Sequence, residues 1–207
     1  MNEHQEIEIK LWVKNLNLIE ELLLHKNAKL LQPKTYEVNL RFDTQKGELS
    51  SAGKALRLRK DKANFLTYKG PSSNQAGARA RTEIQTVVVD FEATRAILEE
   101  LGYQVWMTYE KYRTEYEWED TRISLDEMPF GTFVEIEGQD PRRIHTVCED
   151  LGLNWDRRIP WSYVEIFLKI CNDENFPQAK LTFEIFKTRV IRLENYGIFA
   201  ADELIER

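Results

Sequence analysis

The chain has 207 residues, and its 29 basic and 35 acidic side chains give a net charge of −6. Five Trp, eight Tyr and ten Phe exclude a disordered chain, and no stretch approaches the roughly 20 apolar residues that span a bilayer. The charged N-terminus is unlike a secretory signal. Two cysteines without metal-type spacing favour the reducing cytoplasm, and the acidic pI of about 5.3 argues against general nucleic-acid binding.

Hydrophobic periodicity then predicts an order of strands and helices along one chain. Most segments alternate with a period of two, as in 6–13, where Ile7, Ile9 and Leu11 oppose charged residues. In chain order we expect strand 6–13, helix 17–31, strands 36–43, 55–60, 65–69 and 79–89, helix 91–101, strands 109–118, 122–126 and 133–138, helix 141–151 and a helix near 178–194. Segments 44–54 and 70–80 are predicted to be mobile loops.

The helices carry recognisable ends and apolar stripes. Asn17 is a candidate cap for the first helix, and Asp90 and Asp140 are candidate caps for 91–101 and 141–151. The expected buried stripe of 91–101 is Ile97, Leu98 and Leu101. Because no linker, repeat or low-complexity tract divides the sequence, we predict a single domain over 1–207, with a core at about 5–170 and a helical extension at 171–207.

The charged faces of the strands need an explanation. For one strand a solvated face is the simplest interpretation, but Arg and Lys recur at i, i+2 on strand after strand while the opposite faces are apolar. Eight such antiparallel strands, covered outside by the amphipathic helices, would close into an α+β fold whose barrel is a tunnel with a charged lumen. Unpaired buried charge is costly. The lumen is therefore expected to hold water and an anionic ligand.

The composition of this lumen indicates the ligand's chemistry. Guanidinium groups bind phosphate oxygens through two parallel hydrogen bonds. Clustered carboxylates would repel a polyphosphate unless a hard cation such as Mg²⁺ or Mn²⁺ joined them to it. The pattern therefore indicates a site for a triphosphate and a divalent metal.

Several motifs along the chain resemble those of the CYTH superfamily, the triphosphate tunnel metalloenzymes. The opening Glu6-Ile7-Glu8-Ile9-Lys10 is similar to the family's Glu-x-Glu-x-Lys signature, and further matching pieces follow in order over about 5–170. They are Phe42-Asp43-Thr44, Leu56-Arg57-Leu58-Arg59, Thr67-Tyr68-Lys69-Gly70-Pro71, Arg81-Thr82-Glu83, Lys111-Tyr112-Arg113, Leu125-Asp126, 131–137 and Ser162-Tyr163-Val164-Glu165.

The resemblance implies an eight-stranded tunnel that binds a triphosphate with one or two divalent ions, Mg²⁺ or Mn²⁺. The metal shell it implies is Glu6, Glu8, Asp126, Glu135 and Glu137, and the phosphate-binding set is Lys10, Arg57, Arg59, Lys69, Arg81, Lys111 and Arg113. Our hypothesis for catalysis is that a second metal on the Glu6/Glu8 side activates the nucleophile, while Lys10 orients either the carboxylates or the attacking oxygen.

The motifs look most like the branch labelled class IV adenylyl cyclase, which converts ATP to cyclic AMP and pyrophosphate. Arg41 departs from that branch, where an aromatic residue is expected, and an extra cation there could favour a more phosphate-rich substrate. The alternatives are a triphosphatase acting on tripolyphosphate, thiamine triphosphate or a nucleoside triphosphate, a polyphosphate- or nucleotide-binding module without catalysis, and a lipocalin-like carrier. The carrier would require an apolar lumen. A homodimer is left open.

Overall fold

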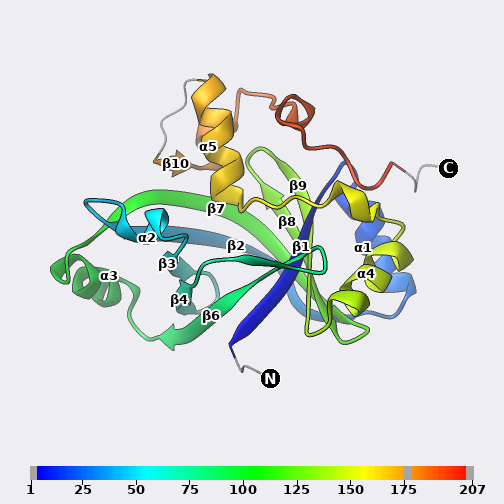
Figure 1. The fold of residues 1–207 in the computed structure, drawn as a ribbon, viewed down its shortest axis with the longest axis horizontal. Helices are drawn as coiled ribbons and strands as arrows, with labels where there is room; N and C mark the ends of the chain where they lie inside the picture. Colours follow the sequence, from blue (N-terminus) through cyan, green and yellow to red (C-terminus); the bar gives the residue numbers. More distant parts are fainter. Residues whose placement is uncertain (1–3, 175–178, 204–207) are drawn as a thin grey trace.

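The computed structural model describes residues 4–174 and 179–203, in which eight antiparallel strands close into a ring. The ring is formed by β1 (Gln5–Val13), β2 (Lys29–Thr44), β3 (Ala55–Lys60), β4 (Asn64–Lys69), β6 (Ala78–Val88), β7 (Tyr103–Trp118), β8 (Thr121–Met128) and β9 (Gly131–Gly138). Its order is β1-β9-β8-β7-β2-β3-β4-β6, and β6 pairs with β1 to close it (Figure 1). All eight predicted strands are therefore present.

Two minor strands lie off this ring. β5 (Ser73–Gln75) forms a hairpin with β6, and β10 (Lys180–Leu181) pairs in parallel with β7. The segment predicted as a loop at 44–54 contains the short helix α2 (Glu48–Ser51). Asp43 anchors this helix, because its carboxylate accepts the backbone N–H groups of Leu49 at 2.8 Å and Ser50 at 2.9 Å.

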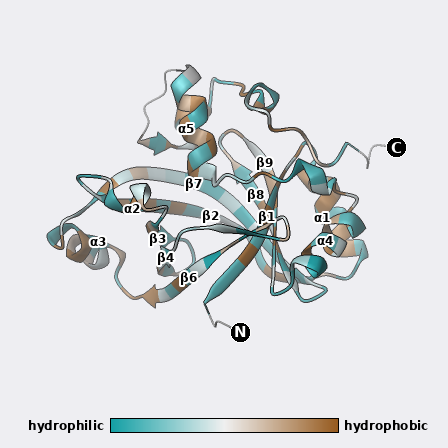
Figure 2. Cartoon of the chain, viewed as in Figure 1, coloured by the Kyte–Doolittle hydropathy of each residue, from teal (hydrophilic) through white to brown (hydrophobic). Residues whose placement is uncertain are grey.

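The apolar faces of the strands point outward and are covered by helices, as predicted. α1 (Leu16–His25) and α4 (Pro141–Asp150) lie together on one side of the ring (Figure 1) and pack against Ile7, Ile9 and Leu11 of β1. α3 (Phe91–Glu100) covers the opposite side, where Leu98 meets Leu58 of β3. The mixed teal and brown of these helices in Figure 2 reflects their two faces. Burial of the apolar faces supplies the main stabilisation of the ring.

The prediction for the first helix needs correction. α1 begins at Leu16, is capped by Asn15 rather than Asn17, and ends at His25 rather than at 31. Leu30 and Leu31 belong to β2 and are 49% and 40% exposed. β2 reaches so far toward its N-terminus because it follows the long partner strand β7, on which Tyr116 pairs with Leu30.

The expected stripe of α3 is also only partly buried. Leu98 is 7% exposed, but Ile97 is 60% exposed and Leu101 69%. The helix packs against β3 and β7 through Leu98 and Phe91. The apolar stripe predicted for this helix is therefore wider than the part of the helix that the sheet covers.

The C-terminal part differs most from the prediction. Instead of a helix near 178–194, residues 179–203 hold β10, the single turn α6 (Phe183–Phe186) and the 3-10 helix η2 (Leu193–Tyr196), while 178 lies outside the described residues. The longer helix is α5 (Tyr163–Glu174), which follows the 3-10 turn η1 (Trp155–Arg157). This correction matters because α5 borders the site.

α5 covers one end of the ring by packing against apolar side chains on the inward faces of the strands. By strand alternation Met107, Met128 and Phe133 share the inward face with the charged residues, yet they form one apolar cluster with Ile166 and Phe167 of α5. In Figure 1 α5 stands above the ring, against β7. The inner surface therefore changes from charged to apolar toward α5.

In the described part of the chain, no helix is both long and apolar enough to cross a membrane.

Candidate functional site

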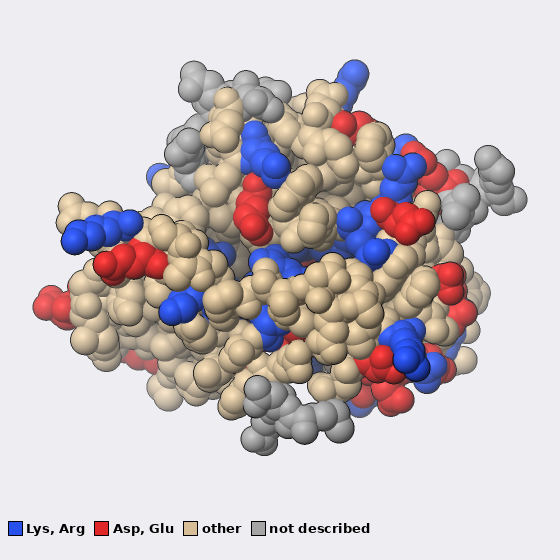
Figure 3. Space-filling view, in the orientation of Figure 1, with Lys and Arg blue, Asp and Glu red and all other residues tan. Residues whose placement is uncertain are grey.

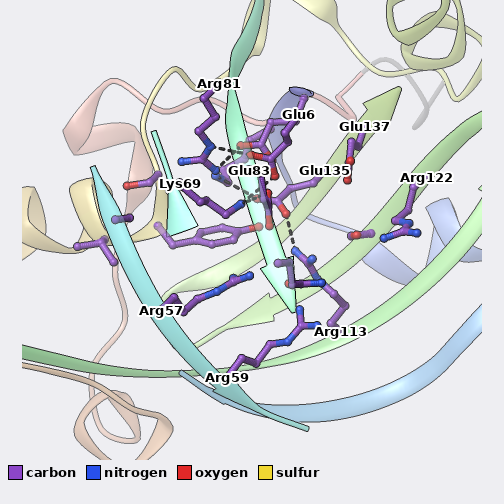
Figure 4. Close-up of a pocket in the computed structure, with 18 of the residues that line it drawn as sticks. Glu6, Arg57, Arg59, Lys69, Arg81, Glu83, Arg113, Arg122, Glu135 and Glu137 are labelled. Carbon is purple, nitrogen blue, oxygen red and sulfur yellow. Dashed lines mark hydrogen bonds and ion pairs between the residues drawn. The ribbon is translucent and has the colours of Figure 1, made fainter. Parts of the chain in front are cut away.

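A polar cavity of about 360 Å³ occupies the inside of the ring. It is lined by all seven of the predicted phosphate-binding residues, Lys10, Arg57, Arg59, Lys69, Arg81, Lys111 and Arg113, and by Glu6, Glu8, Glu135 and Glu137 of the predicted metal shell. Figure 3 shows Lys and Arg side chains gathered in the central hollow of the molecule, and Figure 4 shows the lining side chains converging from several strands. The alternation of the strands therefore brings the predicted site residues together.

Antiparallel pairing builds the site by placing opposite charges face to face. Glu6 lies directly opposite Arg81 across β1 and β6, and Lys10 lies opposite Glu135 across β1 and β9. Such directly opposed side chains are close enough to interact. Charged residues on separate strands thus form a continuous network around the lumen.

The first group of this network surrounds Glu6. The carboxylate accepts hydrogen bonds from Lys69 Nζ at 2.8 Å and Arg81 Nε at 2.6 Å, and Lys69 also contacts Glu83 at 2.7 Å (Figure 4). Burial disfavours the ionised form of Glu6, but the charges of Lys69 and Arg81 outweigh it and hold its pKa well below the ordinary value. Glu6 is therefore a carboxylate at neutral pH.

The second group surrounds Asp126 and Glu135 on β8 and β9. Asp126 is fully buried and accepts hydrogen bonds from Arg113 Nε at 2.6 Å, Lys111 Nζ at 3.1 Å and the Tyr163 hydroxyl at 2.8 Å. Arg113 also binds Glu135, and Lys10 Nζ lies 3.1 Å from that carboxylate. Burial opposes ionisation of Glu135, but Lys10 and Arg113 outweigh it and keep its pKa well below the usual range. Asp126 does not itself line the cavity and holds the cations that do.

A third buried carboxylate, Glu37 on β2, was not among the predicted site residues. It is fully buried, and its oxygens lie 3.7 Å from Lys111 Nζ and 3.8 Å from Arg59 Nη1. Burial raises its pKa, but Lys111, Arg113 and Arg59 outweigh this and lower it to about 2. The alternation of 36–43 already places Glu37 on the charged face, so the sequence held the signal for it.

The carboxylates of β1 and β9 supply the oxygen donors that a hard divalent cation prefers. Glu8 lies directly opposite Glu137, and burial together with the charges of Glu6 and Glu8 raises the pKa of Glu137 to about 7. Within residues 4–174 and 179–203, however, no three acidic, His or Cys side chains are gathered closely enough to hold a metal ion. The donor set fits such an ion chemically, since a cation beside Glu137 would relieve the repulsion that raises its pKa.

Arg41 of β2 and Tyr163 of α5 also line the cavity. Arg41 was expected to add a cation that favours a phosphate-rich substrate, whereas Tyr163 had been given no role. Arg41 follows from the same alternation as Glu37. Tyr163 could not be inferred from periodicity, because it reaches the lumen only through the way that α5 crosses the end of the ring.

Comparison with known proteins assigns the family. A family model of the CYTH domain matches residues 4–157. Because this match spans well over half of the sequence, the chain belongs to the CYTH family. A search of curated proteins finds no significant match.

Solved structures share the fold. A putative adenylate cyclase from Vibrio parahaemolyticus superposes with a TM-score of 0.70 at 23% identity, over 78% of this chain and 97% of the other. A protein of Pyrococcus horikoshii OT3 gives 0.68 at 25% identity, over 80% and 99%. A putative adenylyl cyclase from Hippeastrum, described as having a dominant triphosphatase activity, gives 0.61 at 21% identity, over 79% and 95%.

Proposed function

We propose that this chain is a divalent-metal-dependent enzyme that cleaves a phosphoanhydride bond of a triphosphate inside its tunnel. The observation that carries the proposal is the composition of the cavity, where nine Lys and Arg side chains, seven of them from the predicted set, face six glutamates. Cations of this number would neutralise the charge of a triphosphate, and phosphoryl transfer depends mainly on such positioning and charge stabilisation.

In this proposal Glu6, Glu8, Glu135 and Glu137 would hold Mg²⁺ or Mn²⁺. When bound, the ion would neutralise phosphate charge and lower the pKa of an attacking hydroxyl or water. Asp126 is better suited to position Arg113 and Lys111 than to bind the metal, because its oxygens are already engaged by those side chains and by Tyr163. Arg57, Arg59, Lys69 and Arg81 would complete the phosphate contacts.

Lys10 and Glu8 are the proposed catalytic residues. Lys10 Nζ is held by Glu135 at 3.1 Å and by the carbonyl oxygen of Trp161 at 3.3 Å, and it lies 4.1 Å from the centre of the Tyr163 ring. The ammonium group is thereby fixed at the cavity wall, where it can orient the attacking oxygen. Glu8 projects from the same face of β1, two residues away.

Two reactions fit this chemistry. In the first, the ribose 3′-hydroxyl of ATP attacks the α-phosphorus and pyrophosphate leaves, giving cyclic AMP; the adenylyl cyclase-like motifs and the solved Vibrio relative favour this form. In the second, water attacks the terminal phosphorus and orthophosphate leaves. Arg41 favours hydrolysis, because it adds a cation to the lumen at a position where the cyclase-like branch has an aromatic residue.

One assay panel tests the proposal. Pure protein is incubated with ATP, GTP, thiamine triphosphate or tripolyphosphate in Mg²⁺ or Mn²⁺, and cyclic nucleotide, orthophosphate and pyrophosphate are resolved. We expect turnover of at least one substrate, and none with Glu8→Gln, which serves as the control for contaminating enzymes. If no substrate is turned over but triphosphates still bind, the chain would be a triphosphate-binding module rather than an enzyme.

A further inference from the structure

Two arginines of the lumen differ from the other cations of the predicted phosphate-binding set. Arg41 of β2 and Arg57 of β3 lie directly opposite each other, and both line the cavity. Arg57 donates to the Tyr109 hydroxyl and to Thr67 Oγ1, each at 3.4 Å. The guanidinium of Arg41 lies 5.9 Å from the centre of the Trp106 ring. Across the described residues, neither arginine has a carboxylate oxygen within 4.0 Å.

The remaining cations of the predicted set each have such a partner. Lys10, Lys69 and Lys111 lie within 3.1 Å of Glu or Asp oxygens, and Arg59 contacts Asp61 at 3.0 Å. Arg81 and Arg113 are engaged equally closely. Most cations of the lumen are therefore in ion pairs, whereas the guanidinium groups of Arg41 and Arg57 form no ion pair with a described carboxylate.

The energetics of burial show what this pair lacks. The Nε atoms of Arg41 and Arg57 are buried, and neither has a hydrogen-bond partner in the described part of the protein. Burial, reinforced by the charge of Arg57, lowers the pKa of Arg41. At Arg57, burial is outweighed by Tyr109 and Glu83, which raise the pKa. Arg41 is therefore the less compensated of the two, and a buried cation beside a second cation is costly. An anion that binds both would remove this cost and satisfy their donors.

We propose that Arg41 and Arg57 form a subsite for the terminal phosphoryl group of the substrate, with Arg41 determining specificity for a linear phosphate chain end. This inference rests on the function proposed above. A terminal phosphoryl group carries up to two negative charges and three free oxygens, so it can accept bidentate hydrogen bonds from both guanidinium groups. A phosphoryl group esterified to a nucleoside, or one inside a ring, has fewer free oxygens and less charge.

The wall beyond the pair supports a chain end rather than an organic group. Met107 lies directly opposite Arg41 on β7, and Met107 and Tyr109 belong to the apolar cluster that packs against α5. Trp106 packs against the same cluster. From this cluster Tyr109, Tyr163 and Val164 line the cavity, so a chain end would fit beside them and a nucleoside would lie toward the opposite part of the tunnel.

The test compares a linear triphosphate, which has terminal phosphoryl groups, with a cyclic one, which has none. Binding of linear tripolyphosphate and of cyclic trimetaphosphate is measured by calorimetry in EDTA, for the wild type, Arg41→Gln and Arg41→Lys. We expect Arg41→Gln to weaken tripolyphosphate about 10- to 100-fold, the loss typical of hydrogen bonds between charged groups, and to leave trimetaphosphate within about twofold. Arg41→Lys should recover only part of the affinity, because an ammonium cannot bind bidentately.

A matched control and a fold measurement complete the design. Arg95→Gln removes one positive charge from the outer helix α3, where Arg95 pairs with Glu99, and should not change either affinity. Arg41→Gln should raise the melting temperature of the ligand-free protein, because it removes an uncompensated buried charge.

The two proposals fail in different ways. Equal weakening of both ligands by Arg41→Gln would overturn the subsite while leaving turnover, and hence the proposed function, intact. A wild type that prefers tripolyphosphate but turns over no triphosphate would retain the subsite and overturn the enzyme.

Discussion

Lys10 shows how single residues of this protein are fixed by groups from different elements. Its ammonium contacts Glu135 of β9, the carbonyl oxygen of Trp161 in the connection after η1, and the Tyr163 ring of α5. Each contact is modest alone, but together they leave the side chain little freedom. Such fixed charges are effective in catalysis because they need not reorganise when the reaction occurs.

Glu135 is the residue whose loss should most directly separate function from folding. Glu135→Gln keeps the shape but removes the charge that binds Lys10 and Arg113 and would bind the metal. We expect turnover of the best substrate to fall about 100-fold or more, with an unchanged circular dichroism spectrum. Glu127→Gln, on the partly exposed outward side of β8, is the control. Full activity in Glu135→Gln would refute the metal assignment.

Glu137 gives a prediction for pH. Its pKa in the folded protein is raised to about 7 from an ordinary value of 4.5, so the folded state holds an extra proton between these values. Stability contributed by this group is present below about pH 4.5 and is lost as the pH rises to about 7. Glu137→Gln should therefore raise the melting temperature of the metal-free protein at pH 8 and leave it nearly unchanged at pH 4. An equal difference at both pH values would contradict the raised pKa.

At the scale of elements, α5 contributes both to the apolar core and to the wall of the cavity. Its apolar side chains fill the end of the ring against Met107 and Phe133, and its first residues, Tyr163 and Val164, line the cavity. Burial of the Tyr163 hydroxyl, together with the charge of Asp126 beside it, raises the pKa of Tyr163 well above its ordinary value. The hydroxyl therefore stays protonated and donates to Asp126.

Truncation within α5 tests this double role. Phe167 is fully buried, so Phe167→Ala should lower the free energy of unfolding by about 3–5 kcal/mol, and it should weaken tripolyphosphate binding because the end wall loosens. Leu168→Ala, at the half-buried neighbouring position, should cost less and leave binding unchanged. Denaturant unfolding and calorimetry measure the two effects. Unfolding costs that are equal for the two variants would contradict the position given to α5.

At the scale of the whole molecule, closure of the ring concentrates cations that the overall composition conceals. The chain carries a net charge of −6, yet seven of the predicted cations line one cavity. The outer helix α3 carries the exposed acidic side chains Glu92, Glu99 and Glu100. The sign of the net charge therefore does not describe the surface that a ligand meets inside the ring.

This separation predicts a specific response to polyanions. Tripolyphosphate should raise the melting temperature in EDTA, because it binds only the closed ring; at 100 times its dissociation constant it would add about 2.7 kcal/mol of stability. Sodium chloride at the same ionic strength should produce a smaller shift, since it screens charge without bridging the strands. Scanning calorimetry measures both, and a larger shift with sodium chloride would refute an anion site in the lumen.

Much of this arrangement could be predicted from local sequence. The alternation in β1, β3 and β6 fixes which side chains share the charged face, since successive residues of a strand point to opposite sides. That rule assigned Lys10, Arg57 and Arg81 to the charged faces of their strands, and all three line the cavity. Periodicity failed for Leu30 and Leu31, because their apolar character fits a helix end as well as a strand. The pairing of β2 with β7 selects the strand.

The sequence by itself determined the faces, because the period of two is a property of the extended backbone. Only the tertiary structure decided which charges meet. The resemblance implies that Asp126 is a metal ligand, and register places it opposite Arg113, where its carboxylate also accepts a hydrogen bond from Tyr163. Arg41 and Arg57 were left without a carboxylate for the same reason, since strand order sets each residue's neighbours. Register and ring closure depend on contacts between distant segments, and a local pattern does not contain them.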